Sequence, residues 1–394
     1  MSRRLAGTLL PAMALLLLAF PAGSVAKGPR IEARSWALID SRSGDILVSH
    51  AARRRLPIAS TTKLMTAYVV LHELPLDRLV RAAPYEAEYG ESLLGLRPGQ
   101  RISVRDLLYG LILRSGNDAA YDLALAAAGS EQRFVAEMNR YAAALGLADT
   151  HYANPIGLDQ RGNYSSAADL ATLTRRLLAI PAFAKIADAR SAVLRSVHPR
   201  RRITTINELL RMAPWVTGVK TGHTFGALYV LVGSGQRRGV KLISVAIGAP
   251  TDEDRFVDNI DLLDYGFSLY KRQVPIGAGA VLARPSIRYS GGELPLRAAR
   301  TVAVGLRRDQ RVSVVVNAPD EVEGPIERGE ALGRAGVYVE GRRMASVPLR
   351  AAHTVAAASL LERGGDFLDD EKIPVGIALC VILVGAVLLR RFSR

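Results

Sequence analysis

The chain has 394 residues, which is long enough for two domains, and 49% of them are hydrophobic, which excludes a largely disordered protein. Its single cysteine, Cys380, excludes an intramolecular disulfide, and the 6 histidines form no cluster with metal-ligand spacing, so we expect no metal and no cofactor. The formal net charge is +15, and arginine runs such as residues 53–55 are either solvated faces or surfaces that attract an anionic polymer outside the cell.

The first 26 residues have the pattern of a secretory signal. Arg3 and Arg4 precede an apolar run over residues 9–20, and small residues then lead to Ala26. We predict a signal peptide over residues 1–26 that is cleaved after Ala26. An uncleaved membrane anchor is the alternative, which the short apolar run disfavours. Export from the cytoplasm makes nucleic acid an unsuitable partner.

The first predicted elements form a hairpin and a buried helix. Strand-like runs over residues 36–40 and 46–48 flank a glycine-containing turn. The helix is expected to begin at Ser60, which would place Lys63 on the same face. Burial lowers the pKa of a lysine, and a neutral amine can take the proton of a neighbouring hydroxyl. The stretch is therefore a candidate for nucleophilic catalysis without histidine. A surface helix start is the alternative, because this spacing arises about once by chance in such a chain.

A second polar stretch follows a predicted helix over residues 104–113. Ser115 and Asn117 flank a glycine, and in a tight turn both side chains can point into one cleft. A hydroxyl there can relay a proton, and an amide can hold a substrate carbonyl. The alternative is an ordinary turn with a helix cap before a helix that starts at Ala119.

Further helices are predicted on both sides of a loop over residues 151–159, which contains Asn-Pro and glycine as helix breakers. One covers residues 131–145. The other starts after the loop with Ser165 or Ser166 as its cap.

The third polar stretch is Lys220-Thr221-Gly222, which precedes strand-like runs over residues 228–232 and 241–247. A lysine and a threonine here can lie along a strand edge, and Gly222 would let a substrate approach the backbone closely. Arg255 opens a helical run over residues 256–267. Its guanidinium is either a fork for a carboxylate or a surface group at a helix start.

In this order, the three stretches form the Ser-x-x-Lys, Ser-x-Asn and Lys-Thr-Gly series of penicillin-binding proteins and β-lactamases. With the patterns at residues 106–111, 154–158 and 164–167, the chain resembles the low-molecular-mass penicillin-binding proteins that act as serine D-alanyl-D-alanine carboxypeptidases, closely over residues 30–272. The resemblance implies an α/β (α+β) fold of the β-lactamase/transpeptidase type. In this fold, an antiparallel five-stranded sheet is flanked by helices and joined to an all-helical lobe. We assign the catalytic domain to residues 27–273.

The resemblance also implies roles for the catalytic residues. Ser60 is the acylated nucleophile and Lys63 its general base. Ser115 and Asn117 line the second wall, for proton relay and for contact with the substrate amide. Penicillin and other β-lactam antibiotics would acylate the same serine.

The substrate-binding residues implied in the same way lie on the third stretch and at Arg255. Lys220 supplies positive potential, and Thr221 and Arg255 bind the terminal carboxylate of D-alanine. The backbone N–H groups of Ser60 and His223 form the oxyanion hole. The substrate would be the peptidoglycan stem peptide.

Two features differ from relatives, and rival functions remain open. Ile156 stands where some relatives carry histidine, and residues 151–170 lack a Glu-x-x-Leu-Asn motif, which disfavours efficient antibiotic hydrolysis. A D,D-endopeptidase or a β-lactamase on the same fold is the enzymatic alternative. A cell-wall binding or shape-maintaining protein without catalysis is the other.

The C-terminal third predicts a small domain and a membrane anchor. Residues 274–355 contain short strand-like runs punctuated by glycine and proline, which predicts a compact antiparallel β-rich domain with an unknown partner. A juxtamembrane linker is predicted over residues 356–372.

Residues 373–389 carry no charge and are long enough for a transmembrane helix, with a buried core helix as the alternative. Arginines in the tail, residues 390–394, place that end in the cytoplasm. The body is thus predicted to be extracytoplasmic, on the periplasmic or cell-wall side, and held at the cell membrane by one span.

Overall fold

A computed structural model describes residues 28–359 of the chain. The predicted signal peptide, the predicted span over residues 373–389 and the tail lie outside the described residues. The described chain forms two compact units that divide between Tyr270 and Lys271, whereas the sequence placed the boundary after residue 273. Residues 28–359 contain no helix with the length and apolar character needed to cross a bilayer.

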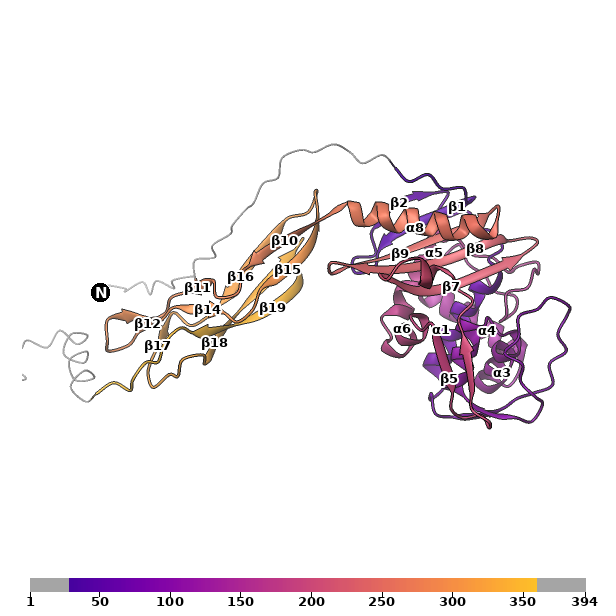
Figure 1. Cartoon of the computed structure of the whole chain (residues 1–394), viewed down its shortest axis with the longest axis horizontal. Coiled ribbons are helices and arrows are strands. Elements are labelled where there is room, and N and C mark those ends of the chain that lie inside the picture. The colour runs from indigo at the N-terminus through magenta and orange to yellow at the C-terminus, as the bar shows by residue number, and fades with distance from the viewer. Residues whose placement is uncertain (1–27, 360–394) are drawn as a thin grey trace, which may run out of the picture. The chain divides into compact units, whose positions relative to one another are not determined.

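The first unit is built on a five-stranded sheet in the order β2-β1-β9-β8-β7 (Figure 1). Every pair of neighbouring strands is antiparallel, as predicted. The strands are β1 (Ser35–Asp40), β2 (Ile46–His50), β7 (Val216–Thr224), β8 (Leu228–Arg237) and β9 (Val240–Ala249). Since consecutive strands β7, β8 and β9 are joined by short turns, they form a meander.

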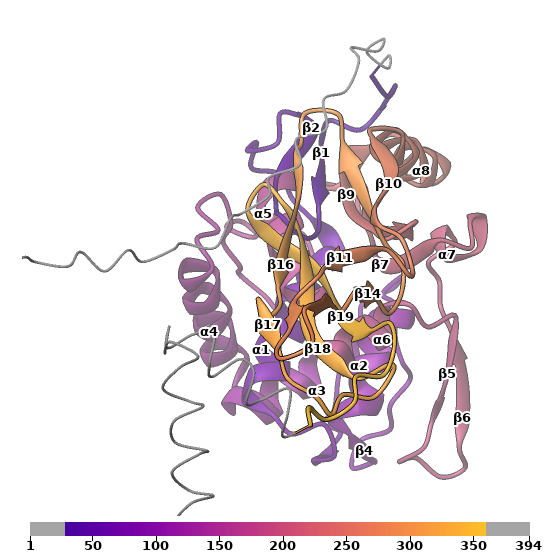
Figure 2. The ribbon, with the colours of Figure 1, turned by 90° about the vertical axis from the view of Figure 1, so that its left-hand side faces the viewer.

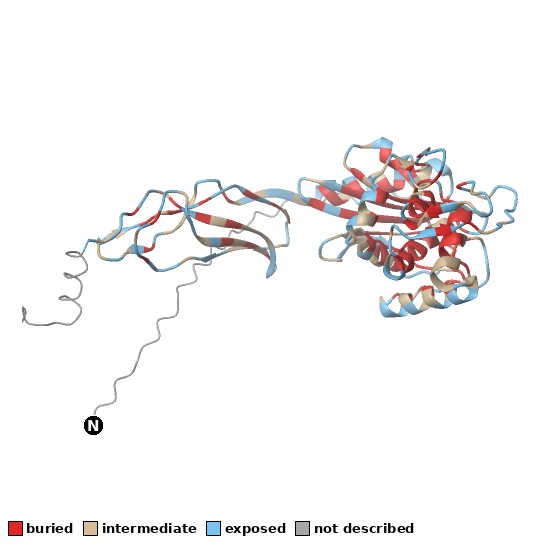
Figure 3. Ribbon diagram, turned by 90° about the horizontal axis from the view of Figure 1, so that it is seen from below, coloured by how far each residue is buried: buried red, intermediate tan, exposed pale blue. Residues whose placement is uncertain are grey.

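Both faces of the sheet are covered. Side chains alternate between the two faces along a strand, so Leu38 packs in one cluster with α8 (Asp252–Ser268), while Ala37 and Ile39 belong to the core that includes α5 (Ala167–Leu178). This double cover explains why β9 is buried at all but one position. Figure 3 shows buried residues along both the strands and the helices of this unit.

The remaining helices of the unit form the predicted helical lobe and share its largest core, except α7 (Leu209–Met212), which packs in a separate cluster with β7, β8 and α8. They are η1 (Ala59–Thr62), α1 (Lys63–Glu73), α2 (Val104–Leu113), α3 (Asn117–Ala128), α4 (Glu131–Ala144), α6 (Pro181–Ala187) and α7 (Leu209–Met212). Two small two-stranded sheets complete the unit, and the second of them forms a separate ribbon in Figure 2. These are β3 (Leu79–Arg81) with β4 (Arg101–Ser103), and β5 (Ser191–Leu194) with β6 (Arg201–Thr204).

Several helix boundaries differ from the predicted ones for local reasons. A single 3-10 turn precedes α1, so Ser60 lies before the α-helix rather than at its first residue. The helix after the second motif begins at Asn117 instead of Ala119. Thr251 and Asp254 form a reciprocal capping box, so α8 begins at Asp252 and Arg255 lies in its first turn. Ser166, one of the two predicted caps, accepts the N–H of Asp169 at the start of α5.

The second unit contains a five-stranded antiparallel sheet in the order β11-β14-β19-β18-β16. One pair departs from the predicted antiparallel arrangement, because β12 and β17 run parallel. The strands of this unit are β10 (Tyr270–Ile276), β11 (Val281–Ala283), β12 (Ser286–Ile287), β13 (Gly292–Glu293), β14 (Leu296–Ala298), β15 (Val302–Arg307), β16 (Val312–Asn317), β17 (Glu321–Val322), β18 (Ala331–Val339) and β19 (Arg342–Ala351).

The helical lobe depends on the packing of α4. Phe134 is fully buried, so we expect Phe134→Ala to lower the free energy of unfolding by about 3–5 kcal/mol, because a cavity replaces the ring. The matched control is Phe225→Ala, since Phe225 is 96% exposed and its loss should change stability by less than about 0.5 kcal/mol. Urea denaturation of the two variants measures both values, and equal effects would contradict this packing.

Candidate active site

The side chains of Ser60 and Lys63 meet as the sequence predicted. The Lys63 ammonium nitrogen Nζ lies 2.9 Å from Ser60 Oγ. Lys63 is fully buried, whereas Ser60 keeps part of its surface exposed. The pair therefore combines an enclosed amine with a hydroxyl that a substrate can reach.

Burial lowers the pKa of Lys63 to about 7, and the negative charges of Glu91 and Asp118 partly oppose this shift. A large fraction of the amine is thus neutral near neutral pH. Lys63 Nζ also donates a hydrogen bond of 2.5 Å to the backbone carbonyl of Ile156, which can only accept. The lone pair of the neutral amine is then available for the proton of Ser60 Oγ.

A second buried lysine lies opposite the first. Lys220 Nζ donates to Ser115 Oγ at 3.0 Å and to the backbone carbonyl of Thr221 at 2.6 Å. Burial lowers the pKa of Lys220 well below its ordinary value, and the positive charges of Lys63 and Arg255 lower it further. The lysines of the first and third motifs are therefore close enough for the charge of Lys63 to affect Lys220. The Ser115 hydroxyl of the second motif is hydrogen-bonded to Lys220.

Asn117 is placed by a residue that the sequence analysis missed. Its Nδ2 donates to Glu91 Oε2 at 2.6 Å, and Tyr85 donates its hydroxyl proton to the same oxygen at 2.6 Å. The Asn117 Oδ1 atom is buried and has no hydrogen-bond partner within the described residues. Glu91 lies in an irregular segment without periodicity, so no sequence signal pointed to it.

Asp118 holds the same irregular segment against the second motif. Its carboxylate accepts the N–H groups of Leu94, Gly95 and Leu96 at 2.7, 2.7 and 3.0 Å. The contact is close, because a Cβ atom added at Gly116 would lie 2.9 Å from the Leu94 nitrogen. The glycine between Ser115 and Asn117 thus lets this segment pack directly on the motif.

Gly222 lets the edge strand β7 pass beside the nucleophile. A Cβ atom there would lie 3.0 Å from the Ser60 nitrogen, which is tighter than ordinary contacts. Thr221 is buried next to it, whereas His223 is exposed and stacks its ring on Tyr229 with 4.3 Å between centroids. The Ser60 backbone nitrogen therefore lies next to the strand that carries the third motif.

Arg255 is directed toward the same strand. Its Nη1 donates to the Gly222 carbonyl at 3.0 Å, and Asp252 forms an ion pair with its Nη2. The side chain is only 11% exposed, which is incompatible with a solvated surface arginine. Its Nε is buried and has no hydrogen-bond partner within the described residues. The guanidinium thus retains one donor for a further acceptor.

The loop around Ile156 packs against the segment that carries the nucleophile. Asn154 Oδ1 accepts the Gly157 N–H at 2.6 Å. Gly157 has a φ of +91°, and a Cβ atom there would lie 2.1 Å from the Ala59 carbonyl oxygen. Only glycine fits this contact. The sequence marked Ile156 for its side chain, but its backbone carbonyl makes the contact with Lys63, and any residue type supplies a carbonyl.

The structure thus brings together the predicted residues Ser60, Lys63, Ser115, Asn117, Lys220, Thr221, Gly222 and Arg255 through direct contacts or shared electrostatics. Within residues 28–359, no group of three histidine, cysteine or carboxylate side chains is placed to hold a metal ion.

The sequence profile of the D-alanyl-D-alanine carboxypeptidase family matches residues 22–251 of the chain. D-alanyl-D-alanine carboxypeptidase DacF of Bacillus subtilis is 30% identical over 376 residues, which cover 91% of this chain and 96% of the relative. The enzyme DacC of Escherichia coli is 33% identical over 368 residues, covering 89% of this chain and 91% of the relative.

The fold is also that of a solved relative. The crystal structure of penicillin binding protein 5 from Haemophilus influenzae matches with a TM-score of 0.59 and 28% identity, covering 84% of this chain and 100% of that chain. Fold, motif geometry and sequence therefore agree, and the chain belongs to the serine D-alanyl-D-alanine carboxypeptidase family of penicillin-binding proteins.

Proposed function

We propose that the protein removes the terminal D-alanine from peptidoglycan stem peptides through an acyl-enzyme on Ser60. The observation that carries this proposal is the 2.9 Å contact between Ser60 Oγ and a fully buried lysine whose pKa is lowered to about 7. An amine of this kind is a general base at neutral pH. The family match to D-alanyl-D-alanine carboxypeptidases supports the same reaction.

In the acylation step, the Ser60 hydroxyl proton moves to Lys63 Nζ while Oγ attacks the carbonyl carbon of the penultimate D-alanine. The resulting oxyanion accepts hydrogen bonds from the backbone N–H groups of Ser60 and His223. The leaving amine needs a proton, and Ser115, hydrogen-bonded to Lys220, relays one to it. The C–N bond breaks and D-alanine leaves. Water then attacks the ester carbonyl and gives one proton back to Lys220 through Ser115, while the departing Ser60 Oγ takes back the proton held by Lys63.

The substrate ends in a free carboxylate, and the third motif together with Arg255 supplies the positive charge that attracts it. Lys220 provides the positive potential, while Thr221 and Arg255 bind the carboxylate. The close contact of Arg255 with the Gly222 carbonyl supports this role, because it fixes the guanidinium beside β7. The Asn117 amide, with its unpartnered Oδ1, contacts the substrate amide.

The same site would bind β-lactam antibiotics covalently through Ser60. We further propose that residues 1–26 direct export, that residues 373–389 anchor the chain in the cell membrane by a single span, and that the catalytic unit works outside the cytoplasm. The β-rich unit lacks a catalytic set among its described residues and would space the active site from the membrane or contact a partner.

The nucleophile can be tested directly. We expect the full chain to take up one labelled penicillin covalently and to release D-alanine from a pentapeptide, and Ser60→Ala to lose both activities. Ser290→Ala, in an exposed turn of the β-rich unit, is the control. Gel fluorography with mass spectrometry of the peptide products measures the two outcomes.

Labelling that persists in Ser60→Ala would overturn the assignment of the nucleophile. The same mass spectra separate the rival enzymes, since an endopeptidase would cleave cross-links and a β-lactamase would turn over free penicillin. Unchanged muropeptides with intact wild-type protein would favour a cell-wall binding protein.

The protonation of Lys63 should control the pH profile. Because the neutral amine is the base, we expect kcat/KM for D-alanine release to rise as the pH increases through about 7 and then to level off. The Glu91 carboxylate raises the pKa of Lys63, so Glu91→Gln should move this midpoint to lower pH.

Glu86→Gln is the matched control, because Glu86 is exposed in the same segment and does not contribute to the lysine pKa. Rate measurements across the pH range with both variants provide the check. A midpoint that does not move in Glu91→Gln would show that another group governs the profile.

A further inference from the structure

A cavity separate from the active site lies in the catalytic unit. It is next to the first residues of β7, far from the turn that joins β7 to β8. It has a volume of about 460 Å³, which is within the usual range for small-ligand pockets. Its walls come from the turn after β1, the end of α5, α6, and the adjoining ends of β7, β8 and β9. None of the predicted catalytic or substrate-binding residues lines it.

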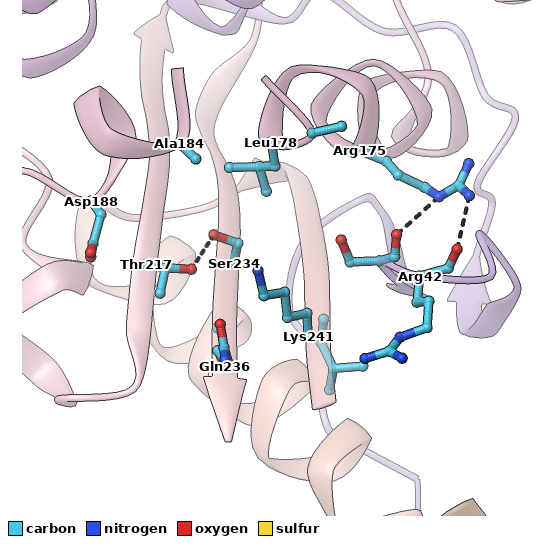
Figure 4. Close-up of a pocket in the computed structure, with 13 residues that line it drawn as sticks. Arg42, Arg175, Leu178, Ala184, Asp188, Thr217, Ser234, Gln236 and Lys241 are labelled. Carbon is cyan, nitrogen blue, oxygen red and sulfur yellow. Dashed lines mark hydrogen bonds between the residues drawn. The ribbon is translucent and has the colours of Figure 1, made fainter. Parts of the chain in front are cut away.

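The charged side chains that line the cavity are separated by sign. Figure 4 shows Asp188 on one side of the hydroxyl pair of Thr217 and Ser234, and Lys241 on the other side. The two hydroxyl oxygens lie 2.8 Å apart. Arg175 adds positive charge beyond Lys241, although its guanidinium also donates to the carbonyls of Ser41 and Arg42 at 3.0 and 2.9 Å.

The polar groups on the two sides lack partners of their own. Within the described residues, the Lys241 ammonium makes no hydrogen bond and no ion pair, and neither does the Asp188 carboxylate. Burial raises the pKa of Asp188, although the charge of Arg190 partly opposes this shift. The side chains of Asp188 and Lys241 are both exposed to solvent, so a ligand in the cavity can reach the carboxylate and the ammonium.

The wall between the charged groups is partly apolar and is formed by Leu178 and Ala184. Ser234 is almost fully buried, so its hydroxyl forms the floor of the cavity rather than a solvated rim. A cation and an anion separated by hydroxyls and small apolar groups match a ligand that has an ammonium at one end, a carboxylate at the other and a short aliphatic body.

We propose that this cavity binds a short peptide with free ends, with its ammonium at Asp188, its carboxylate at Lys241 and its small side chains against Leu178 and Ala184. The site is separate from the Ser60 centre, and the inference does not rest on the proposed reaction. Strand β7 connects the cavity to that centre, because Thr217 precedes Lys220 on this strand.

The test is calorimetric titration of the full chain with L-alanyl-L-alanine. We expect saturable binding that weakens about tenfold or more when the peptide is N-acetylated or carboxy-amidated, because each change removes one charge-assisted hydrogen bond. Lys241→Gln should weaken binding of the free peptide by a similar factor and abolish the preference over the amidated form. Asp188→Asn should abolish the preference over the acetylated form.

Lys185→Gln is the matched control, since Lys185 is exposed on α6 and does not line the cavity. Binding unchanged in this variant but weakened in Lys241→Gln supports the site. The proposal is overturned if wild-type protein shows no saturable binding or if the two lysine variants behave alike. It is also overturned if inorganic phosphate displaces the peptide while acetylation has no effect, because the cavity would then be a simple anion site.

Discussion

The enclosure of the Lys63 amine is the constraint on which the active site depends. A charged ammonium without water or a close counter-ion is costly, so burial favours the neutral base. The surroundings keep this balance near neutrality, because Glu91 and Asp118 restore part of the lost stabilisation of the charge. The Ile156 carbonyl fixes the position of Nζ 2.9 Å from Ser60 Oγ. Geometry and protonation are thus set by the same packing.

Burial has the same effect on the second lysine, Lys220, whose pKa is also lowered. The positive charges of Lys63 and Arg255 add to the effect of burial in lowering the pKa of Lys220, since like charges in one enclosed site repel each other. A substrate carboxylate would relieve that repulsion, and Arg255 adds to the positive potential at the same place. The site therefore favours a ligand with a negative charge, which agrees with a peptide that ends in a free carboxylate.

Close backbone contacts allow distant segments to share this cleft. Gly157 packs against the carbonyl of Ala59, and Gly222 passes beside the nitrogen of Ser60. In the second motif, Gly116 leaves room for the segment that carries Glu91 and Leu94 to pack against it. A side chain at any of these positions would push one segment away from the nucleophile or from the second motif. The position of Ser60 thus depends on the absence of a Cβ atom at these glycines as well as on the contacts of its neighbours.

The sequence by itself determined the reacting groups and their order, because Ser60 with Lys63 and Ser115 with Asn117 are local motifs whose spacing on a turn or helix brings them together. It also indicated several strands through apolar β-branched runs, whereas the five-stranded sheet followed from the resemblance to a known family. Only the tertiary structure decided that Glu91, Asp118 and the Ile156 carbonyl complete the site. Their contribution comes from long-range contacts and burial, and the amine's pKa follows from its surroundings, which no local pattern records.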